Sequence, residues 1–387
     1  MYFDFHTYLK VVRLVVTDKP SPKRLLVHGL ILTLLSIWAV CNAVCLALDR
    51  LFFAGYRKIQ IATPVFIVGN ARSGTTLFHR LLCGDEERFV YFRTWEILFP
   101  SLLQKKTIHT VTAAYQWAFP RAAQRLTDWE NRQLGEIKKQ HPIGINKPEE
   151  DEFLLLLSFA SSVIVVLFPY LDQLTELVTF DDRPAAAQRR IMGFYRECVQ
   201  RQLAFHGGNR TLVSKNPAFV TKMRGLAREF PDAKFVYLIR NPFETLPSIL
   251  KLLRTVWQQL GMDADHIERS TRSLASGCVR DYHYAMDVLA ELPESRCAIV
   301  PYTELIADPK ATVERVYDRL GLSISPVFAR RLEAERTRQK HYQSDNVYSL
   351  EEFGLSEAEM SRGLADIVER FGFRPEQAPV DQVREMV

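Results

Sequence analysis

A short stretch with two glycines has the composition of a loop that binds an anion. It reads GNARSGTT, from Gly69 to Thr76, and directly follows the apolar run Val65–Val68. Gly69 and Gly74 have the spacing of the phosphate loop of nucleotide triphosphatases, but threonine stands where that loop requires lysine. If a helix follows, its first amides point at the bound anion, and Arg72 adds a planar set of donors. The loop also offers the hydroxyl groups of Ser73, Thr75 and Thr76.

A second candidate for anion binding follows the run Lys234–Ile239, which is predicted to be a buried strand. Arg240 stands at the end of this strand, and Pro242 is at a position where helices often begin. Ser248 follows Arg240 by eight residues, about two helical turns, so both side chains can face one phosphate. A triphosphatase usually has an acidic metal ligand at another strand end. Because that residue and the loop lysine are both missing, the sequence disfavours ATP hydrolysis and predicts a site without metal.

These two elements resemble those of the sulfotransferases that use 3′-phosphoadenosine 5′-phosphosulfate (PAPS). RSGTT is similar to their 5′-phosphosulfate loop, and Arg240-Asn-Pro with Ser248 is similar to their 3′-phosphate element. The resemblance covers most of residues 64–373 and is strongest for the branch of tyrosylprotein and microbial enzymes, which has arginine in the loop. In the cytosolic enzymes the second element continues as a plain helix, whereas here Pro247 interrupts it. The segments that carry the remaining resemblance are HPIG, PEEDEF, SKNP, FPDAKF, PYTELIADP and YSLEEFGL.

The resemblance implies PAPS as co-substrate, no metal ion, and transfer of a sulfuryl group to an acceptor hydroxyl. A sulfuryl group carries less negative charge than a phosphoryl group, so arginine, amides and hydroxyls can replace lysine and magnesium. Arg72 and the helix N-terminus are expected to stabilise the charge that builds on the departing 5′-phosphate. Lys215, in VSKNP, resembles the family's lysine near the transferring group, where it could neutralise or protonate the bridging oxygen.

The acceptor hydroxyl needs a base to take its proton. Glu96, in RTWEILFP, is the first candidate, since the related branch has a glutamate in this region. The second candidate is the acidic group Glu149–Glu152, with His141 upstream; its alternative role is to stabilise the N-terminus of the helix expected from Phe153. Other residues near these motifs are interpreted as structural, namely His79, His206, Tyr302 and Glu304. Thr303 is expected to cap the helix that follows it.

The N-terminal part of the chain contains an apolar segment, residues 25–48, that has no charged side chain. Its length suffices to cross a hydrocarbon core of about 30 Å. The basic residues around it weakly favour a cytoplasmic N-terminus. Two alternatives are a helix that lies in the membrane interface and a buried hairpin packed on the catalytic domain. A second apolar run, Phe153–Leu171, is expected to be a fully buried core helix.

Strand-length apolar runs alternate with helical patterns along the rest of the chain, which predicts an α/β, P-loop-like, three-layer fold with a central parallel sheet. Residues 1–58 are expected to be a membrane anchor or amphipathic segment, residues 59–375 the catalytic domain and residues 376–387 a tail. The predicted strands are Val65–Val68, Phe89–Phe92, Leu212–Ser214, Lys234–Ile239 and Cys297–Pro301. The main predicted helices cover Thr110–Phe168, Ala185–Phe205, Ala218–Phe230 and Thr303–Leu320 and one that begins at Pro242.

Charge and cysteine content exclude some classes of binding partner and metal site. A net charge of +5 over 387 residues is too small to indicate nucleic-acid binding, and six cysteines without C-x-x-C spacing do not suggest zinc or disulfides. We therefore expect a membrane-associated sulfotransferase whose acceptor is a small molecule, a lipid or a glycan. It would lie in the Golgi membrane of a eukaryote or on the cytoplasmic face of a bacterial inner membrane. The alternatives are a P-loop kinase or triphosphatase, and a non-catalytic nucleotide-binding membrane protein; Arg72 and Arg240 argue against the latter.

Overall fold

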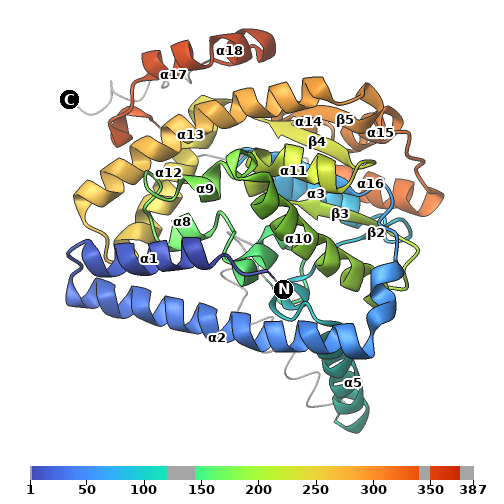
Figure 1. Cartoon of the computed structure of the whole chain (residues 1–387). Helices are drawn as coiled ribbons and strands as arrows, with labels where there is room; N and C mark the ends of the chain where they lie inside the picture. The colour runs from blue at the N-terminus through green and yellow to red at the C-terminus, as the bar shows by residue number, and fades with distance from the viewer. Residues whose placement is uncertain (1, 120–143, 340–348, 375–387) are drawn as a thin grey trace.

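Five parallel strands form the sheet at the centre of the computed structural model, which describes residues 2–119, 144–339 and 349–374 (Figure 1). Their order is β2-β3-β1-β4-β5, so β1 lies between β3 and β4. All five strands predicted from the sequence are present, and the predicted fold class is confirmed. The strands are β1 (Val65–Gly69), β2 (Phe89–Val90), β3 (Thr211–Lys215), β4 (Lys234–Ile239) and β5 (Cys297–Pro301).

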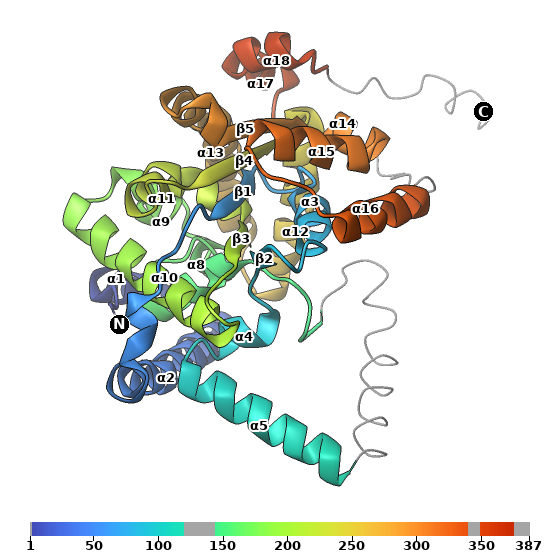
Figure 2. The same ribbon diagram turned by 90° about the vertical axis from the view of Figure 1, so that its right-hand side faces the viewer.

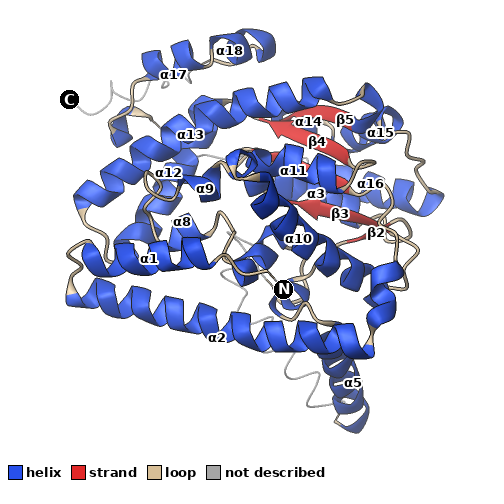
Figure 3. Ribbon diagram, viewed as in Figure 1, coloured by secondary structure: helices blue, strands red, loops and turns tan. Residues whose placement is uncertain are grey.

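Helices cover both faces of the sheet, because its strands are apolar on both sides (Figures 2 and 3). Phe66 and Val68 of β1 belong to the core on one face, and Val65 and Ile67 belong to the core on the other. Successive side chains of a strand point to opposite faces, so a continuous apolar run must be covered twice. One face is covered by α10 (Ala185–Phe205), α11 (Met223–Glu229) and α13 (Ala264–Glu291). The other is covered by α3 (Thr75–Cys83), α15 (Pro309–Arg319) and α16 (Pro326–Gln339).

The prediction that Phe153–Leu171 forms one core helix is wrong, although most of this run is buried. A 3₁₀ helix, η2 (Asp151–Ser158), ends at Phe159, which has a φ of 53°, and a short helix, α8 (Ile164–Leu167), follows. The carboxylate of Glu152 accepts hydrogen bonds from the Ser161 hydroxyl at 2.6 Å and the Ser162 amide at 2.7 Å. Serines that bond locally in this way compete with helical hydrogen bonds, so the run folds back on itself.

The predicted helix Thr303–Leu320 is divided in two. Helix α14 (Tyr302–Ala307) ends at Asp308, whose side chain accepts a hydrogen bond from the Ala311 amide and so caps α15. Thr303 does not cap α14, because the residue at the N-cap position is Pro301. The remaining helical elements are η1 (Ala54–Lys58), α4 (Thr94–Leu98), α5 (Leu102–Ala118), α9 (Thr175–Val178), η3 (Phe180–Asp182), η4 (Pro217–Lys222), α12 (Pro242–Gln259), η5 (Glu294–Arg296), η6 (Glu351–Phe353), α17 (Glu357–Gly363) and α18 (Ala365–Phe371).

The N-terminal segment forms an antiparallel hairpin of α1 (Phe5–Thr17) and α2 (Pro22–Phe52), which runs along one edge of the molecule (Figure 1). By length and composition alone, α2 could cross a membrane. Its inner face, however, is fixed to the catalytic domain by polar side chains. Arg24 is buried and bonds to Asp18 at 2.7 Å and to Asp263, at the start of α13, at 3.1 Å. The structure thus contains a hairpin packed on the catalytic domain, but the hairpin is not the buried one considered as an alternative, because much of α2 is exposed.

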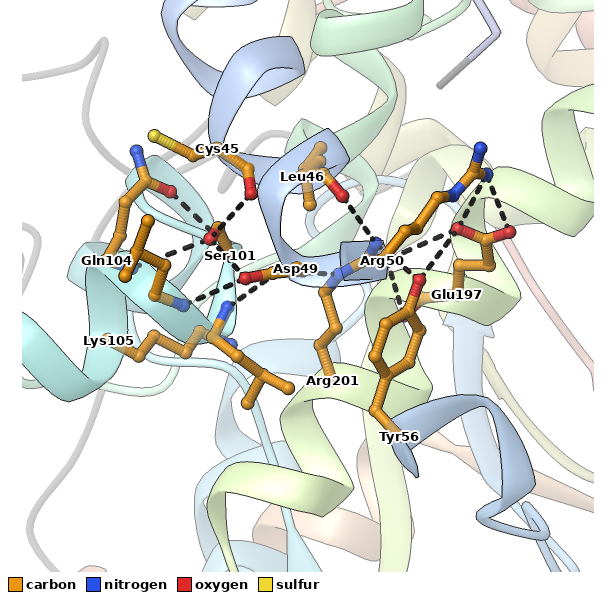
Figure 4. A network of polar contacts seen from close by, with 12 residues as sticks. Cys45, Leu46, Asp49, Arg50, Tyr56, Ser101, Gln104, Lys105, Glu197 and Arg201 are labelled. Atoms are coloured by element: carbon orange, nitrogen blue, oxygen red, sulfur yellow. Dashed lines mark hydrogen bonds and ion pairs between the residues drawn. The ribbon is translucent and has the colours of Figure 1, made fainter. Parts of the chain in front are cut away.

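Asp49 fixes the other end of α2 (Figure 4). It is fully buried and accepts hydrogen bonds from Arg201 of α10 at 2.9 Å, from the Ser101 hydroxyl at 2.8 Å, and from the amides of Leu102 and Leu103. The first amides of α5 lack partners within their own helix, so Asp49 satisfies two of them. The side chain thus joins α2, α5 and α10. The predicted domain boundary near residue 58 falls at the end of η1; His141 and the predicted tail, residues 376–387, lie outside the described residues.

We expect Asp49→Ala to lower the free energy of unfolding by about 3–5 kcal/mol, because it leaves the buried Arg201 without its nearest anionic partner. Chemical denaturation of the full chain measures this change. Arg50→Ala is the matched control: Arg50 pairs with Glu197 at 2.8 Å but is half exposed, so its loss should cost less than about 1 kcal/mol. Equal effects of the two substitutions would contradict the assignment of Asp49 as an anchor.

Candidate active site

The loop Gly69–Thr76 connects β1 to α3 at the carboxyl end of the sheet, where α/β proteins bind their ligands. Its glycines are required by close contacts. A Cβ atom at Gly69 would lie 2.4 Å from the carbonyl oxygen of Leu238 in β4. Gly74 has a φ of 85°, and a Cβ there would lie 2.7 Å from the ring of Tyr302. Both positions require glycine, because a larger residue would clash with these atoms.

The N-terminus of α3 has the features of an anion site. No side chain caps this end of the helix, so the amides of its first turn have no partner from a cap. Ser73 is fully buried, and its hydroxyl has no hydrogen-bond partner. A buried hydroxyl without a partner costs free energy unless a ligand or water bonds to it. Together these groups fit the phosphosulfate expected from the sequence.

Arg72 and Ser248 are brought together from positions far apart in the chain. The Nε atom of Arg72 donates a hydrogen bond to the Ser248 hydroxyl at 3.1 Å. Helix α12 continues through Pro247, so Ser248 faces the loop. Arg72 has a φ of 71°, a conformation that costs free energy in a residue other than glycine and is typical of ligand-binding loops.

Arg240 lies at the end of β4, next to the loop. Its guanidinium donates to the carbonyl oxygen of Arg72 at 3.2 Å, pairs with Glu244 at 2.6 Å and lies over the ring of Tyr302, 4.3 Å from the ring centre. Tyr302 was interpreted as structural from the sequence, but it contacts both Gly74 and Arg240. It directly follows β5, the neighbour of β4, and this position at a strand end is the signal that would have indicated it.

Lys215 connects the loop to the acidic group. It ends β3, which pairs with β1, and its side chain is almost fully buried. Its Nζ atom lies 3.3 Å from the hydroxyl of Thr76 and 2.6 Å from a carboxylate oxygen of Glu150. Glu150 is partly exposed, at 27% of its side chain. A chain of contacts therefore runs from Thr76 of the anion-binding loop, through Lys215, to the accessible carboxylate of Glu150.

Two other members of the acidic group, Asp151 and Glu152, are buried. The pKa of Asp151 is raised to about 6 by burial, and its carboxylate accepts hydrogen bonds from Tyr195, Ser214 and Asn216. Glu152 is also buried and holds the turn after η2. These two residues fix the segment that carries Glu150.

Glu96, the first candidate for the catalytic base, lies in a buried and fully hydrogen-bonded position. Its side chain is fully buried in the helix α4, where it accepts hydrogen bonds from the Arg93 amide at 2.8 Å and from Gln202 at 2.9 Å, and bonds to His206 at 2.8 Å. Burial raises its pKa, but the bond to His206 and the charge of Lys105 outweigh burial and lower the pKa below its usual value. A buried carboxylate that already has these bonds is poorly placed to take a proton from an acceptor, so the structure disfavours Glu96 as the base. His206 is its partner.

An apolar pocket of about 430 Å³ lies beside this site, between α2, α4 and η2. Its walls include Leu34, Leu35 and Trp38 of α2 and Phe153 of η2. Among the described residues that line it, Glu149 has the one ionisable side chain. Glu149 precedes Glu150 and accepts a hydrogen bond from the Glu150 amide at 3.0 Å. The pocket is therefore lined by the residue that directly precedes Glu150, the partner of Lys215. In the described part of the chain, no group of three or more acidic, cysteine or histidine side chains is arranged for a metal ion.

Comparisons with known proteins identify similar chains and folds. The model of the sulfotransferase family matches residues 64–326. A curated protein of Mycobacterium bovis, omega-hydroxy-beta-dihydromenaquinone-9 sulfotransferase Stf3, is 24% identical over 341 residues, which cover 85% of this chain and 81% of the relative. The fold is similar to that of the sulfotransferase STF9 of Mycobacterium avium, with a TM-score of 0.75, 17% identity and coverage of 97% and 94% of the two chains. STF1 of Mycobacterium tuberculosis has a TM-score of 0.67, 19% identity and coverage of 93% and 92%.

Proposed function

The chain belongs to the sulfotransferase family, and we propose that it transfers the sulfuryl group of PAPS to the hydroxyl group of a membrane lipid. The observation that carries this proposal is the continuous line of groups from the loop hydroxyl of Thr76, through Lys215 and Glu150, to the apolar pocket beside Glu149. The anion-binding loop and the apolar pocket lie at opposite ends of this line. Such an arrangement suits a reaction between an anionic nucleotide and an apolar alcohol.

We assign the 5′-phosphosulfate to the loop. Arg72, Gly74 and the first amides of α3 would contact it, together with the hydroxyls of Ser73, Thr75 and Thr76. Arg240 and Ser248 would hold the 3′-phosphate, and the contacts of both residues with Arg72 place them next to the loop. To bind a phosphate, Arg240 must exchange its bond to Glu244 for one to the ligand, since guanidinium and phosphate form strong paired hydrogen bonds.

Glu150 acts as the general base in this proposal. It accepts the proton of the acceptor hydroxyl as the acceptor oxygen bonds to sulfur. PAPS supplies the sulfuryl group, and adenosine 3′,5′-bisphosphate leaves with the electron pair of the broken S–O bond. Lys215 and Arg72 stabilise the negative charge on the leaving oxygen without moving, because β3 and the loop already hold them in place.

A lipid acceptor is supported by the composition of the pocket, whose aliphatic and aromatic walls match a hydrocarbon chain better than a sugar. The relative in Mycobacterium bovis is named for a hydroxylated menaquinone, which is also a lipid alcohol. Incubation with labelled PAPS and a total membrane lipid extract, with soluble glycans in parallel, tests this choice. We expect label in the lipid fraction; label in the glycans alone would exclude a lipid acceptor.

Removal of divalent metal ions is expected to leave activity unchanged, because the proposed charge stabilisation comes from arginine, lysine and backbone amides. Transfer should proceed at the same rate in excess EDTA as in magnesium. Calorimetry in EDTA should detect binding of adenosine 3′,5′-bisphosphate. Tight binding of magnesium–ATP with no binding of the bisphosphate would instead identify a P-loop kinase or triphosphatase.

A further inference from the structure

The side of α2 that faces away from the catalytic domain is an exposed apolar surface. We call it the outer face of α2; its members are Leu26, Leu30, Leu34, Ile37, Val40, Val44 and Leu51. From Leu26 to Val44 they recur every three or four residues, and Leu51 follows seven residues later, so they form one stripe on a helix about 45 Å long. Leu26 is 73% exposed and Val40 is 64% exposed, which is unusual for such residues in a soluble protein. Leu9 and Val16 of α1 are also exposed.

We propose that the outer face of α2 lies in the plane of a lipid leaflet and that the acceptor passes from this leaflet directly into the pocket. This inference rests on the proposed function. In-plane helices usually turn an apolar face to the lipid and a polar face to water. In α2 the polar face is bound to the catalytic domain instead, through Arg24, Asn42 and Asp49. The helix therefore acts as one edge of the enzyme and not as a separate anchor.

A transmembrane orientation conflicts with these contacts. Arg24 pairs with Asp263 near one end of α2, and Asp49 pairs with Arg201 near the other (Figure 4). If α2 crossed the bilayer, Asp263 and Arg201 would have to lie on opposite sides of the membrane, although both belong to the catalytic domain. Either the domain would enter the hydrocarbon or one of the two pairs would break. Charged groups are costly inside a bilayer, and a broken buried pair leaves an uncompensated charge. An in-plane orientation keeps every pair and still removes the apolar stripe from water.

Charges at the two ends of α2 fit an anionic membrane surface. Lys19 and Lys23 are exposed at the start of the helix, and Arg57 and Lys58 are exposed in η1 just after its end. The sequence between Leu25 and Leu48 contains no charge. An apolar stripe with basic residues at both ends is complementary to a leaflet with acidic headgroups, to which each lysine or arginine adds attraction.

The pocket is continuous with the outer face of α2. Leu34 belongs to both, and Ile31, Leu35 and Trp38, on the adjoining side of the helix, line the pocket. Glu149 also lines the pocket, and it directly precedes Glu150 in the chain. A lipid alcohol could thus keep its hydrocarbon chain along α2 while its hydroxyl approaches Glu150. The acceptor would not need to leave the apolar phase, which avoids the cost of exposing its chain to water.

Vesicle flotation with the full-length protein tests the surface independently of catalysis. We expect the wild type to float with vesicles of phosphatidylcholine and phosphatidylglycerol. The double substitution Leu30→Asp, Val40→Asp should lower the partition coefficient by about 100-fold, because two exposed apolar side chains become charged. Val327→Asp is the matched control: Val327 is also exposed but lies on α16, away from the hairpin, so binding should be unchanged. Melting curves verify that each variant is folded.

Two results would overturn the proposal. One is vesicle binding by the double variant equal to that of the wild type. The other is a wild-type protein that does not bind vesicles but forms a dimer, together with loss of this dimer in the double variant. That outcome would make the outer face of α2 an interface between two copies of the chain. Neither result depends on transfer activity or on binding of adenosine 3′,5′-bisphosphate, so a failure of the membrane surface and a failure of the proposed function are distinguishable.

A second variant tests passage through the pocket. Leu35→Trp should narrow the pocket and lower transfer to a long-chain lipid alcohol in vesicles by about tenfold, while flotation stays at the wild-type level. Transfer to a short water-soluble alcohol should decrease less. Equal losses for both alcohols would contradict passage of the hydrocarbon chain along α2.

Discussion

Arg72→Ala is expected to lower kcat/KM for sulfuryl transfer by about 10²–10³-fold while the protein stays folded. The Arg72 side chain is exposed, so its removal leaves no cavity, and its one hydrogen bond is to Ser248 at the rim of the site. In the proposed reaction the guanidinium stabilises negative charge on the departing 5′-phosphate, and loss of one such donor typically has an effect of this size. Steady-state kinetics measure the rate, and calorimetry measures the affinity for adenosine 3′,5′-bisphosphate.

Arg272→Ala is the control for charge alone. Arg272 is strongly exposed and pairs with Glu268 on α13, so its loss removes the same charge away from the loop. We expect near wild-type transfer from this variant. Arg72→Lys should recover part of the activity, because lysine keeps the charge but lacks the planar donors. Undiminished transfer by Arg72→Ala would remove the assignment of the loop as the donor site.

Glu150→Gln is expected to lower kcat by about 10²–10⁴-fold, the usual contribution of a general base. Donor binding should change little, because the groups that would hold the nucleotide are in the loop and at the start of α12. The effect should therefore appear in kcat with the affinity for adenosine 3′,5′-bisphosphate retained. A loss of donor affinity equal to the loss of rate would indicate that Glu150 only positions Lys215 through their ion pair.

The matched substitution is Glu96→Gln. Glu96 is buried and bonded to His206 and Gln202, so the amide should destabilise the fold. Transfer per folded molecule should remain close to that of the wild type. Stability measurements and active-site titration separate the two effects. The opposite pattern, with catalysis lost in Glu96→Gln and kept in Glu150→Gln, would restore Glu96 as the base.

Local sequence determined the sheet and the loop. Short apolar runs followed by a glycine or a charged residue sufficed to find β1, β3 and β4, because a strand buried on both faces needs continuous apolar residues. The GNARSGTT loop was recognisable for a similar reason: its turn depends on glycines that contact adjacent backbone and ring atoms, and only this residue type fits there. The alternation of these strands with helices was enough to predict the three layers.

Only the tertiary structure decided which acidic residue is accessible and where α2 lies. Glu96 and Glu150 are the same residue type, but Glu96 is enclosed by His206 and Gln202, more than a hundred positions away. Glu150 pairs with Lys215 and stays partly exposed. Likewise, α2 has the composition of a transmembrane helix, and its partners Asp263 and Arg201 come from distant helices. Burial and hydrogen bonding depend on which segments meet in space, and local composition does not contain that information.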